Sequence, residues 1–253
     1  MFINHFAGKI VKRVWLNLDD KESDFPFYKE GIPTHNWIFP ISGCLSALLL
    51  IYIDLPISPV LKIAVRASLL VVLPFLGLHF VSSHVYTSLF RKLRKSNFKL
   101  IVLTVLSAIV IQLFLHFLLT ELFQYKFAEN GGVDVFSTLG TFDRIVYSFF
   151  FFGFQLMGEE MLRIVPFLFF LQFFTQNLGM RRKLSILSIW FMSAAIFALL
   201  HLPTYNWNMI QVLVLFTGSF VMNYAYVRTK NVWVVYLVHL LYDFLLMIPV
   251  LFS

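Results

Sequence analysis

The chain has 253 residues, of which 59% are hydrophobic and only 13% charged, and its mean hydropathy is +0.81. Soluble domains carry about 25% charged residues, so this composition excludes a soluble domain and indicates an integral membrane protein. The formal net charge of +7 comes from short basic clusters between apolar runs, as in membrane proteins, and does not indicate a nucleic-acid partner. Because the apolar runs are continuous, without the alternation of β-barrel strands, the predicted fold class is all-α: a polytopic bundle of transmembrane helices.

The N-terminal segment, residues 1–36, is predicted to precede a transmembrane helical domain at 37–253. Apolar residues recur every four positions over residues 2–18, with basic residues on the other faces and Trp15 as an anchor. This pattern predicts an amphipathic helix that lies in the membrane interface. Residues 19–36 are polar and contain proline and glycine, which is typical of a linker or a surface cap.

Apolar runs long enough, or nearly long enough, to cross a bilayer occupy the rest of the chain. They lie at Trp37–Ile53, Ala67–Phe90, Leu100–Thr120, Ile145–Phe174, Leu184–Leu202, Met209–Val227 and Val232–Leu251. Most of the 20 Lys and Arg residues precede the first run or fall on alternate connections between runs. Since basic residues favour the cytoplasmic side, we expect about seven transmembrane helices and a cytoplasmic N-terminus.

Charged side chains interrupt the fourth run at Glu159, Glu160 and Arg163. Each charge costs about 2.5–3.5 kcal/mol at the centre of a bilayer, so such groups are rare and usually functional. Spacings of three and four allow all three side chains to share one helix face, where the arginine can neutralise one carboxylate but not two. The stretch by itself fits general acid–base chemistry and an internal ion pair between helices equally well.

Three more ionisable residues lie in or at the ends of the later runs: His201, His239 and Asp243. His201 is close to Pro203 and hence near a helix end, whereas His239 and Asp243 are four residues apart and share a helix face. A lone histidine of this kind is more often a packed core residue than a functional one. Ionisable groups on three separate helices, however, are most cheaply accommodated in one shared, wet cavity. The sequence has neither a His-Glu-x-x-His zinc helix nor a Gly-x-Ser-x-Gly elbow, so the favoured enzymatic interpretation is a water-activating Glu/His site.

These residues follow the motif order of the CPBP family (CAAX proteases and bacteriocin-processing enzymes, also called Abi), which the chain resembles over about residues 145–245. The family pattern is Glu-Glu-x-x-x-Arg, then Phe-x-x-x-His, then His-x-x-x-Asn/Asp on successive later helices. The matching residues here are Glu159, Glu160 and Arg163, then Phe197 and His201, then His239 and Asp243.

The arginine follows the Glu pair after two intervening residues, where the family pattern has three. If the Glu pair aligns, Glu159 is the catalytic carboxylate. If Arg163 aligns, Gly158 takes the place of that carboxylate, and activity is in doubt. We favour the first alignment; the shorter spacing also resembles the related PrsW-like branch.

The resemblance implies an intramembrane endopeptidase that acts on a membrane-bound protein or peptide, and we expect it in a bacterial cell membrane. In such an enzyme Glu159 and His201 activate a water, and His239 with Asp243 stabilises the oxyanion or positions the water. Two histidines and two carboxylates are also compatible with zinc, but their spacing is not diagnostic, and we favour a mechanism without metal or other cofactor.

The remaining family positions are expected to support the catalytic carboxylate. Glu160, which is counted among the catalytic residues, and Arg163 would hold it in place, and Arg163 and Phe197 are counted as supporting residues. Two other functions stay open: a non-catalytic scaffold or immunity protein that keeps the polar residues for packing, and a proton-coupled transporter that uses them as a relay. The transporter is less favoured because no internal repeat is visible in the sequence. The sequence leaves the oligomeric state open.

Overall fold

The structure, a computed structural model, describes residues 24–29, 31–51, 53–127, 140–147 and 151–251. Over these ranges the chain is helical and contains no strand, which confirms the all-α fold class. The α-helices are α2 (Ile38–Ile51), α3 (Pro59–His79), α4 (Val85–Leu89), α5 (Lys95–Phe123), α7 (Thr141–Val146), α8 (Phe152–Gln172), α9 (Arg182–Leu200), α10 (Met209–Thr229) and α11 (Val232–Leu251). The amphipathic helix predicted over 2–18 lies outside the described residues.

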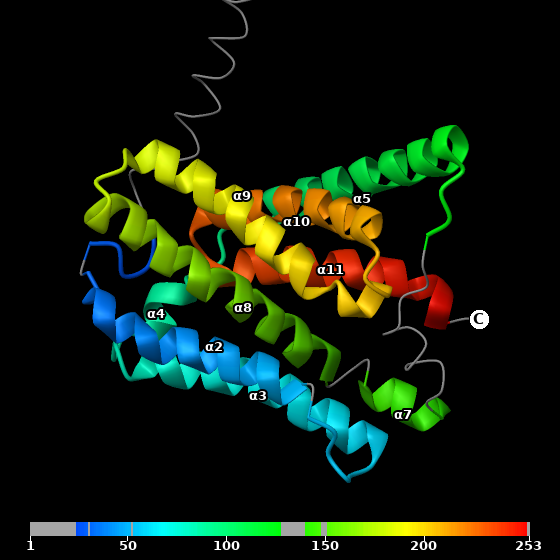
Figure 1. Cartoon of the computed structure of the whole chain (residues 1–253), viewed down its shortest axis with the longest axis horizontal. Helices are drawn as coiled ribbons and strands as arrows, with labels where there is room; N and C mark the ends of the chain where they lie inside the picture. Colours follow the sequence, from blue (N-terminus) through cyan, green and yellow to red (C-terminus); the bar gives the residue numbers. More distant parts are fainter. Residues whose placement is uncertain (1–23, 30, 52, 128–139, 148–150, 252–253) are drawn as a thin grey trace, which may run out of the picture.

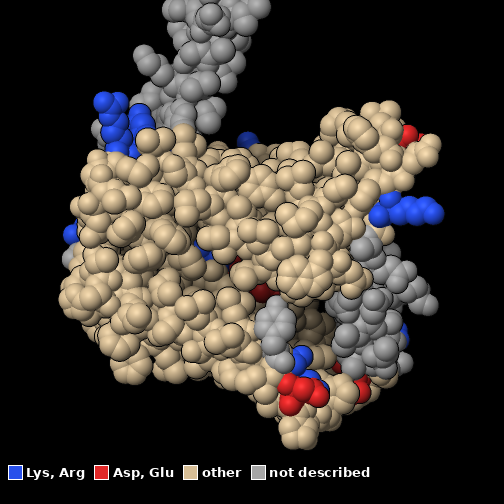
Figure 2. Space-filling model, viewed as in Figure 1, with Lys and Arg blue, Asp and Glu red and all other residues tan. Residues whose placement is uncertain are grey.

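Five helices of the described ranges are long and apolar enough to cross a membrane: Thr34–Ile51, which ends with α2, then α3, α5, α9 and α10. The apolar part of α11, Val232–Met247, is shorter, and α8 contains three charged residues. Figure 2 shows a face of the molecule that is mostly uncharged, with most of the charged side chains toward its edges and a few charged atoms deep near its middle. The protein is therefore an integral membrane helical bundle, and the count of seven spans stays a prediction.

The second predicted span is displaced from the helix that the structure contains. The prediction was Ala67–Phe90, whereas α3 runs from Pro59 to His79. Ser58 caps this helix and proline occupies its first position, where a missing N–H costs nothing. Lys62 lies in the first turn and pairs with Asp54 in the preceding loop, and this hydrogen bond lowers the pKa of the Asp54 carboxyl. The predicted span begins too late because Lys62, a charged residue in the first turn of the helix, finds its partner in the preceding loop.

Helix α8 is the central element of the bundle. It packs against α3, α9, α11 and α2, and Figure 1 shows it crossing between the α2–α3 pair and the group formed by α9, α10 and α11. Helix α5 packs against α10 and α11. Because neighbours surround α8, its charged side chains at positions 159, 160 and 163 are directed into protein and not into lipid.

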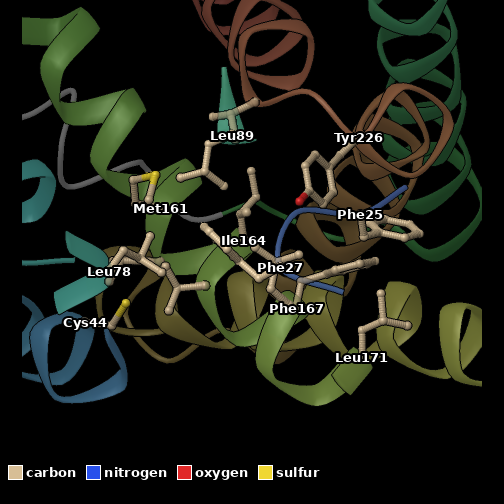
Figure 3. Packing of buried hydrophobic residues seen from close by; sticks show 14 of the residues in the cluster. Phe25, Phe27, Cys44, Leu78, Leu89, Met161, Ile164, Phe167, Leu171 and Tyr226 are labelled. Atoms are coloured by element: carbon tan, nitrogen blue, oxygen red, sulfur yellow. The ribbon is translucent and has the colours of Figure 1, made fainter. Parts of the chain in front are cut away.

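The described part of residues 1–36 packs onto the bundle. Phe25 and Phe27 are buried in the main hydrophobic cluster, where the Phe25 ring lies 5.5 Å from that of Phe167 and 6.0 Å from that of Tyr226 (Figure 3). The Asp24 carboxylate also lies 2.5 Å from the Arg182 guanidinium at the start of α9. This part of the segment is therefore a packed cap; the predicted domain boundary at residue 36 stays a prediction.

Candidate active site

Side chains of α8, α9 and α11 meet in the interior of the bundle. Oε2 of Glu159 lies 3.9 Å from Nε2 of His201 and 3.9 Å from Nε2 of His239. Nε2 of His239 also lies 3.4 Å from Oδ2 of Asp243. These four residues, named here the Glu159 cluster, are brought together although they are separated by up to 84 positions in the sequence.

The Glu159 cluster is partly open. The side chains of Glu159, His201 and Asp243 are 16%, 25% and 30% exposed, whereas that of His239 is 4% exposed. On the face shown in Figure 2, acidic atoms are visible in a recess between apolar surfaces. A substrate or water can therefore approach the carboxylates without the bundle coming apart.

One hydrogen bond of His201 shows which of its ring nitrogens can accept a proton. Nδ1 lies 2.8 Å from the carbonyl oxygen of Phe197, which can only accept, so Nδ1 carries the proton. In a neutral imidazole the other nitrogen then holds a lone pair. That nitrogen, Nε2, is the one that faces Glu159. The proline two residues on ends α9 here, and His201 is its C-terminal cap residue.

His239 has a different environment, because both of its ring nitrogens face carboxylates. Nδ1 lies 2.8 Å from Oε1 of Glu160, and Nε2 faces Asp243. An imidazolium, which donates from both nitrogens, satisfies this arrangement. The two histidines therefore differ: His201 presents a lone pair, and His239 presents a donor held between two acids.

Glu160 and Arg163 lie in a second, fully buried group. Glu160 pairs with Arg163, whose guanidinium also donates to Oδ1 of Asn223 at 2.9 Å and to Oγ of Ser219 at 3.3 Å. We call these four residues the Arg163 network. The expectation that Glu160 and Arg163 hold Glu159 differs from the observed geometry: Glu160 binds His239, and Glu159 finds other partners. Glu160, paired with Arg163, thus contacts His239 and not Glu159.

Phe197 separates the charged groups of the site. Its ring centroid lies 4.3 Å from the guanidinium carbon of Arg163, 4.6 Å from the ring centroid of His201 and 5.7 Å from that of His239. A cation over an aromatic face is attracted by the ring quadrupole, and the attraction grows when water is excluded. The aromatic ring of the second motif therefore packs against both the arginine and the histidines.

Sequence reasoning missed several polar residues that complete the site. Ser219 and Asn223 are four residues apart on α10, and this spacing already placed them on one helix face. Gln155 donates from Nε2 to Oε1 of Glu159 at 3.1 Å, and Tyr147 donates to Oε1 of Gln155 at 2.7 Å. Gln155 lies one helical turn before Glu159, and this spacing was the signal that could have identified it.

Gly158 distinguishes the two motif alignments. A Cβ at this position would lie 2.4 Å from Cβ of Leu70 and 3.0 Å from its backbone carbonyl carbon, so α3 and α8 are in close contact there. A side chain at position 158 would therefore be directed at α3 and away from the histidines. The geometry favours the alignment in which the Glu pair is matched and Glu159 is the carboxylate that faces the imidazoles.

The site contains side chains of the kinds that bind zinc, namely histidines and carboxylates. Within the part of the chain that the structure describes, no group of three or more His, Cys, Asp or Glu residues is arranged to hold a metal ion. The mechanism without metal stays a prediction.

The chain is thus a helical membrane bundle with an interior cluster of acids and imidazoles. The family model described as type II CAAX prenyl endopeptidase Rce1-like matches residues 55–245, a range that includes every predicted site residue. The chain belongs to this Rce1-like family, in agreement with its resemblance to the CPBP family. Neither a curated protein nor a solved structure gives a significant match.

Proposed function

We propose that this protein is an intramembrane endopeptidase that hydrolyses a peptide bond of a membrane-associated protein or peptide by means of a water activated by Glu159 and His201. The family supports proteolysis in general. The observation that carries the mechanism is the position of one carboxylate oxygen of Glu159, at 3.9 Å from Nε2 of each of two histidines.

Glu159 and His201 act as the proton acceptors of the reaction. A separation of 3.9 Å is too long for a hydrogen bond, so Oε2 of Glu159 and Nε2 of His201 both keep their acceptor capacity for a water. General acid–base groups placed in this way contribute about 10²- to 10⁴-fold to a rate. The proton taken from the water then passes to the amine that leaves the cleaved bond.

His239 stabilises the negative charge that develops on the peptide carbonyl. Its Nδ1–H is held by Glu160 at 2.8 Å, whereas Nε2 lies 3.4 Å from Oδ2 of Asp243 and 3.9 Å from Oε2 of Glu159, so this second N–H is the donor that turns to the oxyanion. A donor that is already oriented in a low-dielectric site lowers the barrier without reorganisation during the reaction. Arg163 acts through Glu160 and is a positioning residue of this histidine, not of Glu159.

The proposal is tested with purified protein in liposomes and a farnesylated peptide that ends in a CAAX sequence, together with a comparison of protein N-termini in cells with and without the protein. Glu159→Gln and His201→Gln are expected to insert and fold while cleavage falls at least about 100-fold. Glu121→Gln and His84→Gln make the same chemical changes at exposed positions far from the cluster and keep wild-type cleavage. Full cleavage by both Glu159→Gln and His201→Gln would contradict the proposal and favour a scaffold.

A further inference from the structure

A chain of hydrogen bonds leads from α7 to the Glu159 carboxylate. The hydroxyl of Tyr147, which directly follows α7, donates to Oε1 of Gln155 at 2.7 Å. Nε2 of Gln155, one turn before Glu159 on α8, donates to Oε1 of Glu159 at 3.1 Å. All three side chains are partly buried. None of the motifs used to identify the site includes Tyr147 or Gln155.

The direction of this chain follows from the chemistry of its members. An ionised carboxylate only accepts hydrogen bonds, so the amide of Gln155 must turn its NH₂ group toward Glu159. Its carbonyl oxygen then faces the other way and needs a donor, which the phenolic O–H of Tyr147 supplies. Tyr147 therefore fixes which end of the amide Gln155 presents to the carboxylate.

The consequence is that the two oxygens of Glu159 have separate tasks. Oε1 is held by Gln155, whereas Oε2 is the oxygen directed at the two imidazoles. A carboxylate with one oxygen fixed cannot rotate freely about its terminal torsion, which is otherwise broad for a Glu side chain. The free oxygen is thereby kept in the position where a water can be deprotonated.

We propose that Gln155 and Tyr147 are positioning residues for the proton-accepting step, acting in series through Oε1 of Glu159. The inference rests on the proposed function of Glu159. A merely structural role for Gln155 would be that of an ordinary helix pair four residues apart, which stabilises the helix slightly and contributes nothing to turnover.

The experiment measures kcat and KM for the peptide cleavage with Gln155→Met and Tyr147→Phe. Methionine keeps the length of the side chain and removes the donor, and phenylalanine removes only the hydroxyl. Since misplacement of a reacting group by about 1 Å can cost about 100-fold, we expect kcat of Gln155→Met to fall on the order of 10- to 100-fold with KM unchanged. Tyr147→Phe is expected to lower kcat less, by about 3- to 10-fold, because Gln155 remains.

Two matched controls make the same changes elsewhere. Gln176→Met alters an exposed glutamine of η3 (Phe173–Asn177), and Tyr86→Phe alters an exposed tyrosine of α4. Both are expected to keep wild-type kcat and KM. In a series arrangement the double variant Gln155→Met/Tyr147→Phe has the kcat of Gln155→Met alone, because the effect of the hydroxyl on Glu159 passes through the amide.

The outcomes separate this inference from the function on which it rests. If Glu159→Gln is inactive while Gln155→Met keeps wild-type kcat, or changes KM alone, the positioning role is wrong and the proposed function stands. If the two single variants each lower kcat but their effects multiply in the double variant, the serial arrangement is wrong. If Glu159→Gln cleaves the peptide at the wild-type rate, the proposed function fails and the inference fails with it.

Discussion

Glu159 and Glu160 are adjacent in the sequence but belong to two regions with different physical character. Successive residues of a helix point about 100° apart. Glu160 is directed into the Arg163 network, where its side chain is completely buried, and Glu159 is directed into the partly open Glu159 cluster. One helix thus supplies both a buried structural ion pair and an accessible acid, and His239 touches both regions.

Burial determines how much stability the protein loses when a carboxylate is removed. Removing one partner of a buried ion pair leaves a charge in a low dielectric, which is strongly destabilising. Removing a carboxylate that solvent already reaches costs little stability, and its effect falls on the chemistry. The Arg163 network is therefore expected to control folding, and the Glu159 cluster to control turnover.

The largest expected effect is that of Glu160→Ala. The substitution leaves the Arg163 guanidinium and one nitrogen of His239 without their carboxylate, and we expect a loss of about 3–5 kcal/mol in the free energy of unfolding. Glu159→Ala, its matched control, makes the same change at a partly exposed side chain and is expected to change stability by less than about 1 kcal/mol. Steric trapping in bicelles measures both. Equal losses would mean that the two regions do not differ.

A smaller effect is expected from Gly158→Ala, which tests the helix register that directs the two glutamates apart. The added Cβ collides with Leu70, so α3 and α8 must separate, and overpacking of this kind costs about 1–3 kcal/mol. Gly140→Ala is the control, because a Cβ there meets nothing within 4 Å. Unfolding measured in the same bicelles should show the loss for Gly158→Ala alone; an unchanged stability would contradict the close helix contact.

The smallest effect on stability is expected from Asp243→Asn. Its side chain is 30% exposed, and His239 keeps its bond to Glu160, so the change in the free energy of unfolding should stay below about 1 kcal/mol. Peptide cleavage is expected to fall about tenfold, since the imidazolium loses one of its two acids. If instead this variant unfolds as readily as Glu160→Ala, Asp243 belongs with the buried network, and the division into two regions is incorrect.

Much of the site was predictable because ionisable side chains in apolar helices are costly. That cost identified Glu159, Glu160 and Arg163 in one run and His201, His239 and Asp243 in two others. The partners of each residue were not predictable. Helical spacing allowed Arg163 to pair with either glutamate, and only the side chains that α10 and α11 bring to Arg163 and Glu160 decided for Glu160.

The uncharged partners were missed for a different reason. Amide and hydroxyl side chains such as Gln155 and Tyr147 are not costly enough in a helix to attract notice, and their importance depends on what lies beside them. Phe25 and Phe27 were read as part of a linker or cap for a similar reason: two aromatic residues next to Pro26 show no helical or strand period.

The amino-acid sequence alone determined that the chain is a bundle of membrane-crossing helices and which ionisable residues lie inside it. Both follow from local composition, because a bilayer requires long apolar runs and admits charges only at a cost. Tertiary structure decided where α3 begins and that Glu160, not Glu159, pairs with Arg163. It also decided that Gln155, which accepts a hydrogen bond from Tyr147, holds one oxygen of the Glu159 carboxylate. These depend on the depth and rotation of each helix against its neighbours, which are set by side-chain packing between segments far apart in the chain.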